Sequence, residues 1–473
     1  MNWVKQLTEN KTFLLSLWVA ICFGLFVNGI NSFISSSEFW SIYLSQKILS
    51  FDPSWSSVYL KPLFHLILSS VYLLNLNDFY HIYAVKILFS LNGVLQFFLI
   101  FRILNLVQRQ NFYSLVLSVF LFCSPFYLDN YDRVRSDQLA LTFTLLFLLN
   151  HLSNLELKNW ISLFLITLIP CIAIKHIYFV VICLPFLPYR FFKVEFFKLN
   201  VIRRLICCLI FINLFIFGLY FSIPAFAYWL NSIEENIYST DILLWWMKKE
   251  WLYLYLSTLP FFLKKFRIFL SKKNLERLSL VQIFIFFLIS IHPQKFDFFI
   301  ASFLPILYLP GLLFLIFLNS ENAVAFKKVL PALFIVFILV FYIAKKDSRF
   351  FSLNNPQLIA IDRISNIVTK NNLSYLDGMG ILPKGNNLGC FVSPNDDLAN
   401  SSCILSIENK VPDVIIVTNR LMSLKFDFNS LEKFGYIGVG PNFFIKAHLI
   451  NITNSAMTDW PPPSLIFTTS QIY

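Results

Sequence analysis

Residues 13–30 read FLLSLWVAICFGLFVNGI, a run without a single charged side chain. A helix needs about 20 predominantly apolar residues to cross a hydrocarbon core of about 30 Å. Apolar runs of about this length recur between Phe13 and Ala344. Helices suit these runs because each satisfies its own backbone hydrogen bonds in lipid, whereas barrel strands would alternate apolar and polar residues. The sequence therefore predicts a polytopic α-helical membrane protein.

The composition and the placement of charge support this prediction. The chain has 473 residues, of which 57% are hydrophobic and 14% are charged, whereas soluble chains carry about 25% charged residues. Much of the net charge of +12 lies in short basic loops around residues 190–204 and 264–277. By the positive-inside rule such loops are cytoplasmic, so they predict the topology and give no support to a nucleic-acid partner.

With the basic loops in the cytoplasm, residues 1–344 are predicted to form a transmembrane domain of about 11 helices. The first span lacks a small-residue cleavage site after it, so we expect it to be retained. A first external loop covers residues 31–61. It is followed from Pro62 by an apolar helix that is short for a span and is predicted to be interfacial or re-entrant.

The chain changes character in residues 345–473, where Asn, Asp, Gly and Pro become frequent. We expect a soluble α/β domain on the extracytoplasmic side, with a helix at 358–369 and strands at 414–418, 436–439 and 443–447. Cys390 and Cys403 lie in this domain and can pair if the compartment is oxidising.

Ionisable residues next to the apolar runs gather on the predicted external side. Such residues are functional candidates because a charge near lipid costs free energy. Lys61 precedes Pro62, so an anion held there would meet both an ammonium group and the free N–H groups of a helix start. The carboxylate candidates are Glu38, Asp52 and Asp137, and the cationic candidates are Lys61, Arg135, Lys175 and Lys295.

A pocket that contains carboxylates and several cations beside lipid could bind one class of substrate well, namely a lipid phosphate that carries a group to be transferred. The cations would neutralise the phosphate leaving group, and a carboxylate would deprotonate the acceptor hydroxyl. Each residue alone could also be an interfacial anchor or a loop charge. For Lys61 or Lys175, a side chain that snorkels to the membrane interface is a sufficient explanation. The spacing of His65, His81 and His176 predicts no metal site.

Short stretches with these residues follow one another along the chain. They are SEFW at 37–40, SQKILSFD at 45–52, YLKPL at 59–63, RVRSDQLAL at 133–141, IKH at 174–176, QKFDF at 294–298 and Leu304-Pro305. In this order they resemble the C-type superfamily of membrane glycosyltransferases, and within it the family 39-like branch of protein O-mannosyltransferases and the lipid A aminoarabinose transferase. Two departures stand out: Ser37 replaces the first residue of the family's acidic pair, and no glycine follows Lys175.

The resemblance implies hexosyl or pentosyl transfer, with inversion, from a polyprenyl-phosphate donor to a hydroxyl of a lipid, glycan or protein acceptor. It implies Glu38 and Asp137 as catalytic carboxylates and Lys61 as a ligand of the donor phosphate. It implies no cofactor and no metal. The remaining pocket residues would be Asp52, Arg135, Lys175 and Lys295.

A role in the cell envelope, in lipopolysaccharide or protein glycosylation, would place the chain in the bacterial inner membrane with residues 345–473 in the periplasm. An endoplasmic-reticulum location is the alternative. Two other functions remain open. One is a transporter or flippase of lipid-linked sugar, which the one-sided charges and the lack of a repeat disfavour. The other is a non-catalytic member of the same fold, which the loss of the first acid favours.

Overall fold

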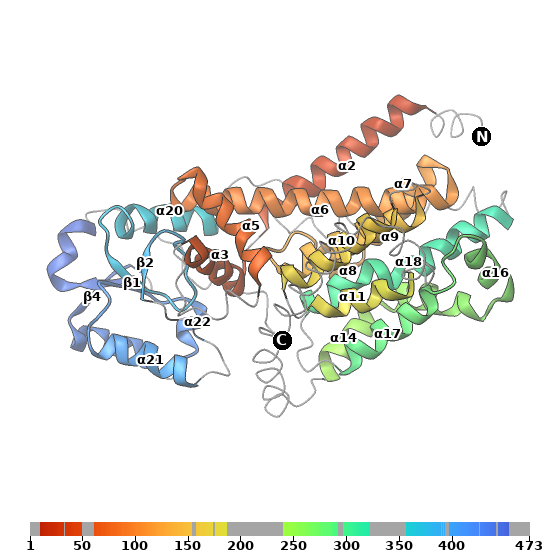
Figure 1. The fold of residues 1–473 in the computed structure, drawn as a ribbon. Helices are drawn as coiled ribbons and strands as arrows, with labels where there is room; N and C mark the ends of the chain where they lie inside the picture. The colour runs from red at the N-terminus through yellow and green to blue at the C-terminus, as the bar shows by residue number, and fades with distance from the viewer. Residues whose placement is uncertain are drawn as a thin grey trace, which may run out of the picture. The chain divides into compact units, whose positions relative to one another are not determined.

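The computed structural model describes residues 10–32, 34–49, 61–153, 158–173, 176–186, 240–291, 297–321, 356–388, 390, 392, 397–424, 426–440 and 443–453. These residues are mostly helical, with a small sheet towards the C-terminal end (Figure 1). Contacts between Cα atoms group the chain into two compact units. The helical unit comprises residues 1–29, 59–64 and 89–350, and the sheet unit comprises residues 30–58, 65–88 and 351–473.

The helical unit contains most of the apolar helices. α6 (Asp78–Gln108) has residues 78–88 in the sheet unit and the rest in the helical unit, and α5 (Pro62–Ser70) is divided after Phe64. The other described helices of this unit are α2 (Lys11–Asn31), α7 (Asn111–Phe122), α8 (Pro125–Leu128), α9 (Ser136–Leu152), α10 (Lys158–Ile172), α11 (Ile177–Cys183), η3 (Leu184–Phe186), α14 (Thr240–Lys249), α15 (Trp251–Thr258), η5 (Leu259–Phe262), α16 (Lys264–Lys272), α17 (Leu278–Ile291) and α18 (Asp297–Glu321).

Three of the described helices are long and apolar enough to cross a membrane, which supports the prediction of a helical membrane protein. They are α2, α6 and residues Phe299–Ser320 of α18. The predicted total of about 11 spans stays a prediction. Several apolar runs form shorter or interrupted helices: the run at 250–265 breaks at Pro260, in η5, because proline cannot continue the hydrogen-bond ladder. The spans predicted at 205–223 and 328–344 lie outside the described residues.

Helices of the helical unit approach closely where a glycine leaves room. At Gly311 of α18, an added Cβ would lie 2.7 Å from the Ser257 Oγ atom and 3.1 Å from the Leu256 carbonyl carbon on α15. Small residues permit such backbone approach between membrane helices, where packing and polar contacts replace the hydrophobic effect. α15 and α18 therefore form a tight pair in the core of this unit.

The sheet unit contains a five-stranded sheet with the order β2-β1-β3-β5-β4. β1 pairs in parallel with β2 and with β3, whereas β5 pairs antiparallel with β3 and with β4. The strands are β1 (Ser374–Leu376), β2 (Asn386–Asn387), β3 (Val414–Ile416), β4 (Tyr436–Gly440) and β5 (Phe443–Lys446). The helices are α3 (Ser36–Leu49), η1 (Val71–Leu74), α20 (Pro356–Val368), α21 (Asp397–Glu408), α22 (Asn419–Met422), η6 (Phe428–Phe434) and η7 (Ala447–Thr453), together with parts of α5 and α6.

The predicted helix at 358–369 and the three predicted strands are confirmed by α20, β3, β4 and β5. The sequence analysis missed β1, β2 and α21, whose segments show no apolar alternation or long apolar run. In addition, α3 forms a helix within residues 31–61, the predicted first external loop, where no helix was predicted.

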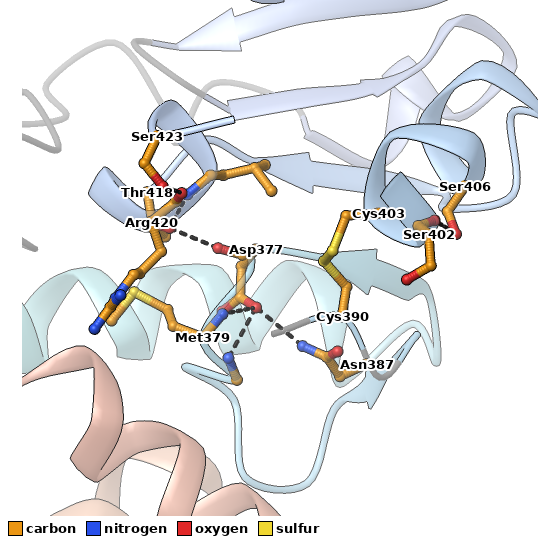
Figure 2. Close-up of a disulfide and its surroundings, with 12 residues drawn as sticks. Asp377, Met379, Asn387, Cys390, Ser402, Cys403, Ser406, Thr418, Arg420 and Ser423 are labelled. Atoms are coloured by element: carbon orange, nitrogen blue, oxygen red, sulfur yellow. Dashed lines mark hydrogen bonds between the residues drawn. A yellow bond between two sulfur atoms is a disulfide. The ribbon is translucent and has the colours of Figure 1, made fainter. Parts of the chain in front are cut away.

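Asp377 lies at the carboxyl end of β1 and is completely buried. Its carboxylate accepts the backbone N–H groups of Met379, Gly380 and Ile381 at 2.7–3.1 Å, and the Asn387 amide at 3.0 Å (Figure 2). Burial raises the pKa of Asp377 and these hydrogen bonds oppose the rise. With all four donors satisfied by one side chain, Asp377 holds the turn after β1 in place.

Cys390 and Cys403 form a disulfide within the sheet unit (Figure 2), which confirms the predicted pairing. The bond joins the segment after β2 to α21, and both cysteines are buried in a cluster with Ile407 and Leu421. Replacing both cysteines with serine should lower the free energy of unfolding of this unit by about 3 kcal/mol, because the bond closes a loop between residues that are 13 positions apart in the chain. Protease resistance of the full chain in increasing urea measures the loss. The matched control replaces Cys123 and Cys171, which are free thiols of the helical unit, and an equal loss in this control would contradict the prediction.

Asp413 joins β1, β3 and β5 at the surface of the sheet unit. It accepts the Ser374 N–H and hydroxyl at 3.0 and 2.7 Å and forms an ion pair with the Lys446 ammonium at 2.9 Å. Burial raises the pKa of Asp413, but the hydrogen bonds from Lys446 and Ser374 outweigh burial, so the net pKa is lowered. Its contribution to stability is therefore complete above the ordinary pKa and is lost as the pH falls through the lowered value.

This linkage predicts that, as the pH falls below the ordinary pKa of aspartate, the wild-type sheet unit loses stability more steeply than the Asp413→Asn variant does. Hydrogen exchange of the β3 amides across this range measures both slopes. Equal slopes in the two proteins would show that Asp413 does not contribute to acid unfolding.

Candidate functional site

Glu38 lies in the first turn of α3 and is 2% exposed. Its Oε2 atom accepts the Ser35 N–H at 2.6 Å, while the Ser35 carbonyl accepts the N–H groups of Glu38 and Phe39. This is the glutamate half of a capping box, in which the acid three residues into a helix reaches back to the residue before the helix. The position also favours negative charge, since free N–H groups point out of the helix start. Glu38 is thus a buried carboxylate in a fixed orientation.

Apolar and aromatic contacts hold α3 in the core of the sheet unit. Phe39 is completely buried in a cluster with Ile361 of α20 and with Tyr375 of β1. The rings of Trp40 and Tyr43 stack at 5.3 Å, and at Gly380 (φ 71°) an added Cβ would lie 2.9 Å from the Tyr43 Cβ atom. The positive φ and the close approach both require glycine at that position.

Hydrogen bonds hold α3 and the segment before it in place. The Tyr43 hydroxyl donates to the Asn387 carbonyl at 3.2 Å, and burial together with the nearby Asp377 carboxylate raises the pKa of Tyr43 to about 12. Before α3, the Gln357 side chain accepts the Ile34 N–H and donates to the Ile34 carbonyl, both at 2.9 Å. The segment with Glu38 is therefore built into the same core as the C-terminal α/β elements.

Asp78, at the start of α6, connects further parts of the sheet unit. This completely buried carboxylate accepts the Ser365 and Thr369 hydroxyl groups at 2.7 Å each, and the Lys384 N–H at 2.7 Å. Because three donors depend on one buried side chain, the contact fixes α20 and the turn before β2 against the beginning of α6.

Asp137 lies in the first turn of α9 in the helical unit and is 3% exposed. The His176 Nδ1 atom lies 3.8 Å from the Asp137 Oδ1 atom, and both side chains are buried. Arg135 has an extended backbone at the residue before the helix, and its carbonyl accepts the Gln138 N–H at 3.2 Å. Arg135 and Asp137 thus lie at the start of α9, and the His176 imidazole, at the residue before α11, lies beside the Asp137 carboxylate. An imidazole near a carboxylate can exchange a proton with it.

A polar network within the helical unit holds α9 against α6. The Gln96 amide donates to the Gln138 carbonyl at 2.8 Å and to the Thr142 hydroxyl at 3.0 Å, and its carbonyl oxygen accepts the Tyr127 hydroxyl. The Thr142 hydroxyl donates to Asn92 at 2.8 Å. Buried hydrogen-bond networks of this kind favour one arrangement of the helices they join. This network fixes the residue directly after Asp137.

Sequence reasoning missed Glu250, a completely buried acid between α14 and α15. Its Oε1 atom accepts the Ser124 hydroxyl at 2.8 Å and the Phe126 N–H at 2.9 Å, which holds the start of α8. The only signal in the sequence is a lone acid beside Trp251 and close to Trp245 and Trp246. A lone acid near an apolar run is a candidate for burial by its position alone.

The predicted site residues are distributed over both units. Glu38 belongs to the sheet unit, whereas Lys61, Arg135 and Asp137 belong to the helical unit. Asp52, Lys175 and Lys295 lie outside the described residues. Among the described side chains, no group of three or more His, Cys, Asp and Glu residues could hold a metal ion.

In comparisons with known proteins, no family model, no curated protein and no solved structure matches the chain.

Proposed function

We propose that this chain is a membrane glycosyltransferase that moves a hexosyl or pentosyl group from a polyprenyl-phosphate donor to an acceptor hydroxyl outside the cytoplasm. The observation that carries the proposal is that both predicted catalytic acids, Glu38 and Asp137, are buried carboxylates in the first turn of a helix. Burial and fixed orientation are what a general base requires, because its oxygen must meet one proton in one geometry.

In the proposed step, the acceptor oxygen forms a bond to the anomeric carbon while the bond from that carbon to the phosphate oxygen breaks. Glu38 or Asp137 takes the hydroxyl proton, and the polyprenyl phosphate leaves with the electron pair of the broken bond. Lys61, Arg135, Lys175 and Lys295 are proposed to neutralise the developing charge on the phosphate. Attack opposite the leaving group inverts the anomeric carbon.

The packing of α3 supports a role for the C-terminal elements in this activity. Glu38 shares a core with α20 and β1 through Phe39. We therefore propose that residues 345–473 keep the first external loop in its working conformation and contribute to acceptor selection. The count of about 11 spans and a periplasmic location of this domain belong to the same proposal.

A specific observation also favours the non-catalytic alternative. The hydrogen bond from the Ser35 N–H to Glu38 gives this acid a structural role that needs no chemistry. The two roles differ in what they require, because capping needs only an acceptor oxygen whereas a base needs a carboxylate.

The test is transfer of radiolabelled sugar from polyprenyl-phosphate donors to membrane acceptors by the purified full chain. We expect transfer by the wild type, and strong losses in Asp137→Asn and Lys61→Ala. Full activity in both of these variants and in Glu38→Gln would show that the site is wrong. A wild-type protein that transfers nothing but moves lipid-linked sugar across vesicles would establish the transporter alternative.

A further inference from the structure

The basic segment after η5 forms an amphipathic helix, α16, at one end of the helical unit. Its buried face consists of Phe266 and Leu270, which are 0% and 1% exposed. The Phe266 ring lies 5.5 Å from the Phe314 ring and 5.9 Å from the Phe317 ring of α18. These contacts anchor α16 along its length, so the opposite face has a fixed orientation.

The opposite face combines cationic and apolar side chains. Lys264, Lys265, Arg267 and Lys272 are exposed, and Ile268 is 48% exposed between them. At the end of η5, two residues before the helix begins, Phe262 is 82% exposed. A helix with lysine and arginine beside exposed aromatic and aliphatic residues is typical of a segment that lies in the bilayer interface.

A cavity of about 280 Å³ opens at the side of α16, next to residues of both its exposed and its buried face. It is lined by Phe261, Arg267, Leu270, Glu276 and Ser279. This volume is at the small end of ligand pockets, so it suits a head group better than a whole lipid. The apolar lining residues and the guanidinium group give the cavity the two chemistries that a lipid head group and its first methylenes require.

Arg267 is the cation available to a ligand in this cavity. Of its basic neighbours, Lys273 donates to the Val107 carbonyl at 3.0 Å and Arg277 donates to the Pro185 carbonyl. Within the part of the chain that the structure describes, the Arg267 guanidinium makes no ion pair or hydrogen bond. A guanidinium binds phosphate oxygens through two parallel N–H groups, and this geometry favours phosphate over other anions.

The surrounding charges define the class of ligand. Residues 264–277 contain six basic side chains, namely Lys264, Lys265, Arg267, Lys272, Lys273 and Arg277, and Glu276 is the one acid. The basic excess attracts a negatively charged membrane surface. Glu276 lines the cavity itself and would repel a multiply charged phosphate, so a phosphodiester with a single negative charge fits better.

We propose that this cavity binds the phosphodiester of an anionic phospholipid, with Arg267 on the phosphate and the exposed Phe262 in the lipid layer. The proposal concerns a site within the helical unit and does not depend on sugar transfer. Under this proposal the basic segment that contains α16 binds a lipid, in addition to setting the topology through its charge.

Native mass spectrometry of the full chain released from detergent micelles tests this site. With phosphatidylglycerol and phosphatidylcholine of equal chain length in competition, we expect preferential retention of phosphatidylglycerol. Arg267→Ala should weaken its retention by about tenfold to hundredfold, as expected for loss of charge-assisted hydrogen bonds. Arg267→Lys keeps the charge but loses the paired geometry, and it should show an intermediate loss.

The matched control is Lys248→Ala, which removes an exposed cation from α14 and should leave retention unchanged. Equal retention of both lipids, unchanged retention in Arg267→Ala, or an equal loss in Lys248→Ala would overturn the proposal. Displacement of the lipid by an equal concentration of inorganic phosphate would also overturn it, because the site would then recognise free phosphate.

Discussion

Replacing Glu38 with glutamine should lower sugar transfer by about 10²-fold to 10⁴-fold while the sheet unit stays folded. The expected loss is that of a general base. Glutamine at the third position of a helix still accepts the N–H of the residue before the helix, so the hydrogen bond from Ser35 can persist. The substitution thus removes the base and keeps the cap. Transfer rates and the urea midpoint of protease resistance are measured on the same preparations.

The matched control is Glu408→Gln, which makes the same chemical change at an exposed site in α21. It should leave both measurements unchanged. Full transfer by Glu38→Gln would assign Glu38 to helix capping alone and would leave Asp137 as the candidate base. Loss of both transfer and protease resistance would show that the effect of Glu38 is structural.

Replacing Asp78 with alanine should destabilise the sheet unit by about 3–5 kcal/mol. Three donors lose their acceptor together: the buried hydroxyl group of Ser365, and the partly buried hydroxyl group of Thr369 and N–H of Lys384. Each buried donor without a partner costs about 1–3 kcal/mol. Asp78→Asn keeps an acceptor oxygen and should lose less. Hydrogen exchange of the α20 amides in the full chain measures the loss.

Asp362 on α20 provides the matched control, since its side chain is half-buried and its carboxylate makes no hydrogen bond among the described residues. Asp362→Ala should change stability by less than about 1 kcal/mol. A similar small change for Asp78→Ala would contradict the view that this carboxylate joins α6 to the C-terminal elements.

Local patterns in the sequence were sufficient for several elements. Proline before an apolar run predicted the start of α5 at Pro62, because the fixed φ of proline suits the first helical residue. Short runs rich in residues that favour strands predicted β3, β4 and β5, and α20 followed from its amphipathic period. The apolar face of α20 is visible as a period in the chain, and the β3 run is a continuous apolar stretch of the kind that forms a buried strand.

Other features could not be predicted, because their stability comes from distant residues. β2 consists of two asparagines, which have low strand propensity, and it forms through parallel pairing with β1. The role of Asp78 depends on Ser365, which is 287 residues away in the chain. The burial of Glu38 and Asp137 is consistent with their selection as candidates, whereas Glu250 gave only a weak signal because one acid alone forms no motif.

The reciprocal hydrogen bonds between Ile34 and Gln357 have a consequence for synthesis of the chain. The partners are 323 residues apart, so α3 leaves the ribosome long before the residues that complete its core exist. Contacts of such separation form late, because a long loop must close before they contribute. Until then, Phe39 and its neighbours are exposed to whatever surrounds the nascent protein, and the unit is open to misfolding or capture by chaperones. Chains interrupted before Pro356 should therefore be cleared as incomplete products, which couples assembly of the segment around α3 to completion of the whole polypeptide.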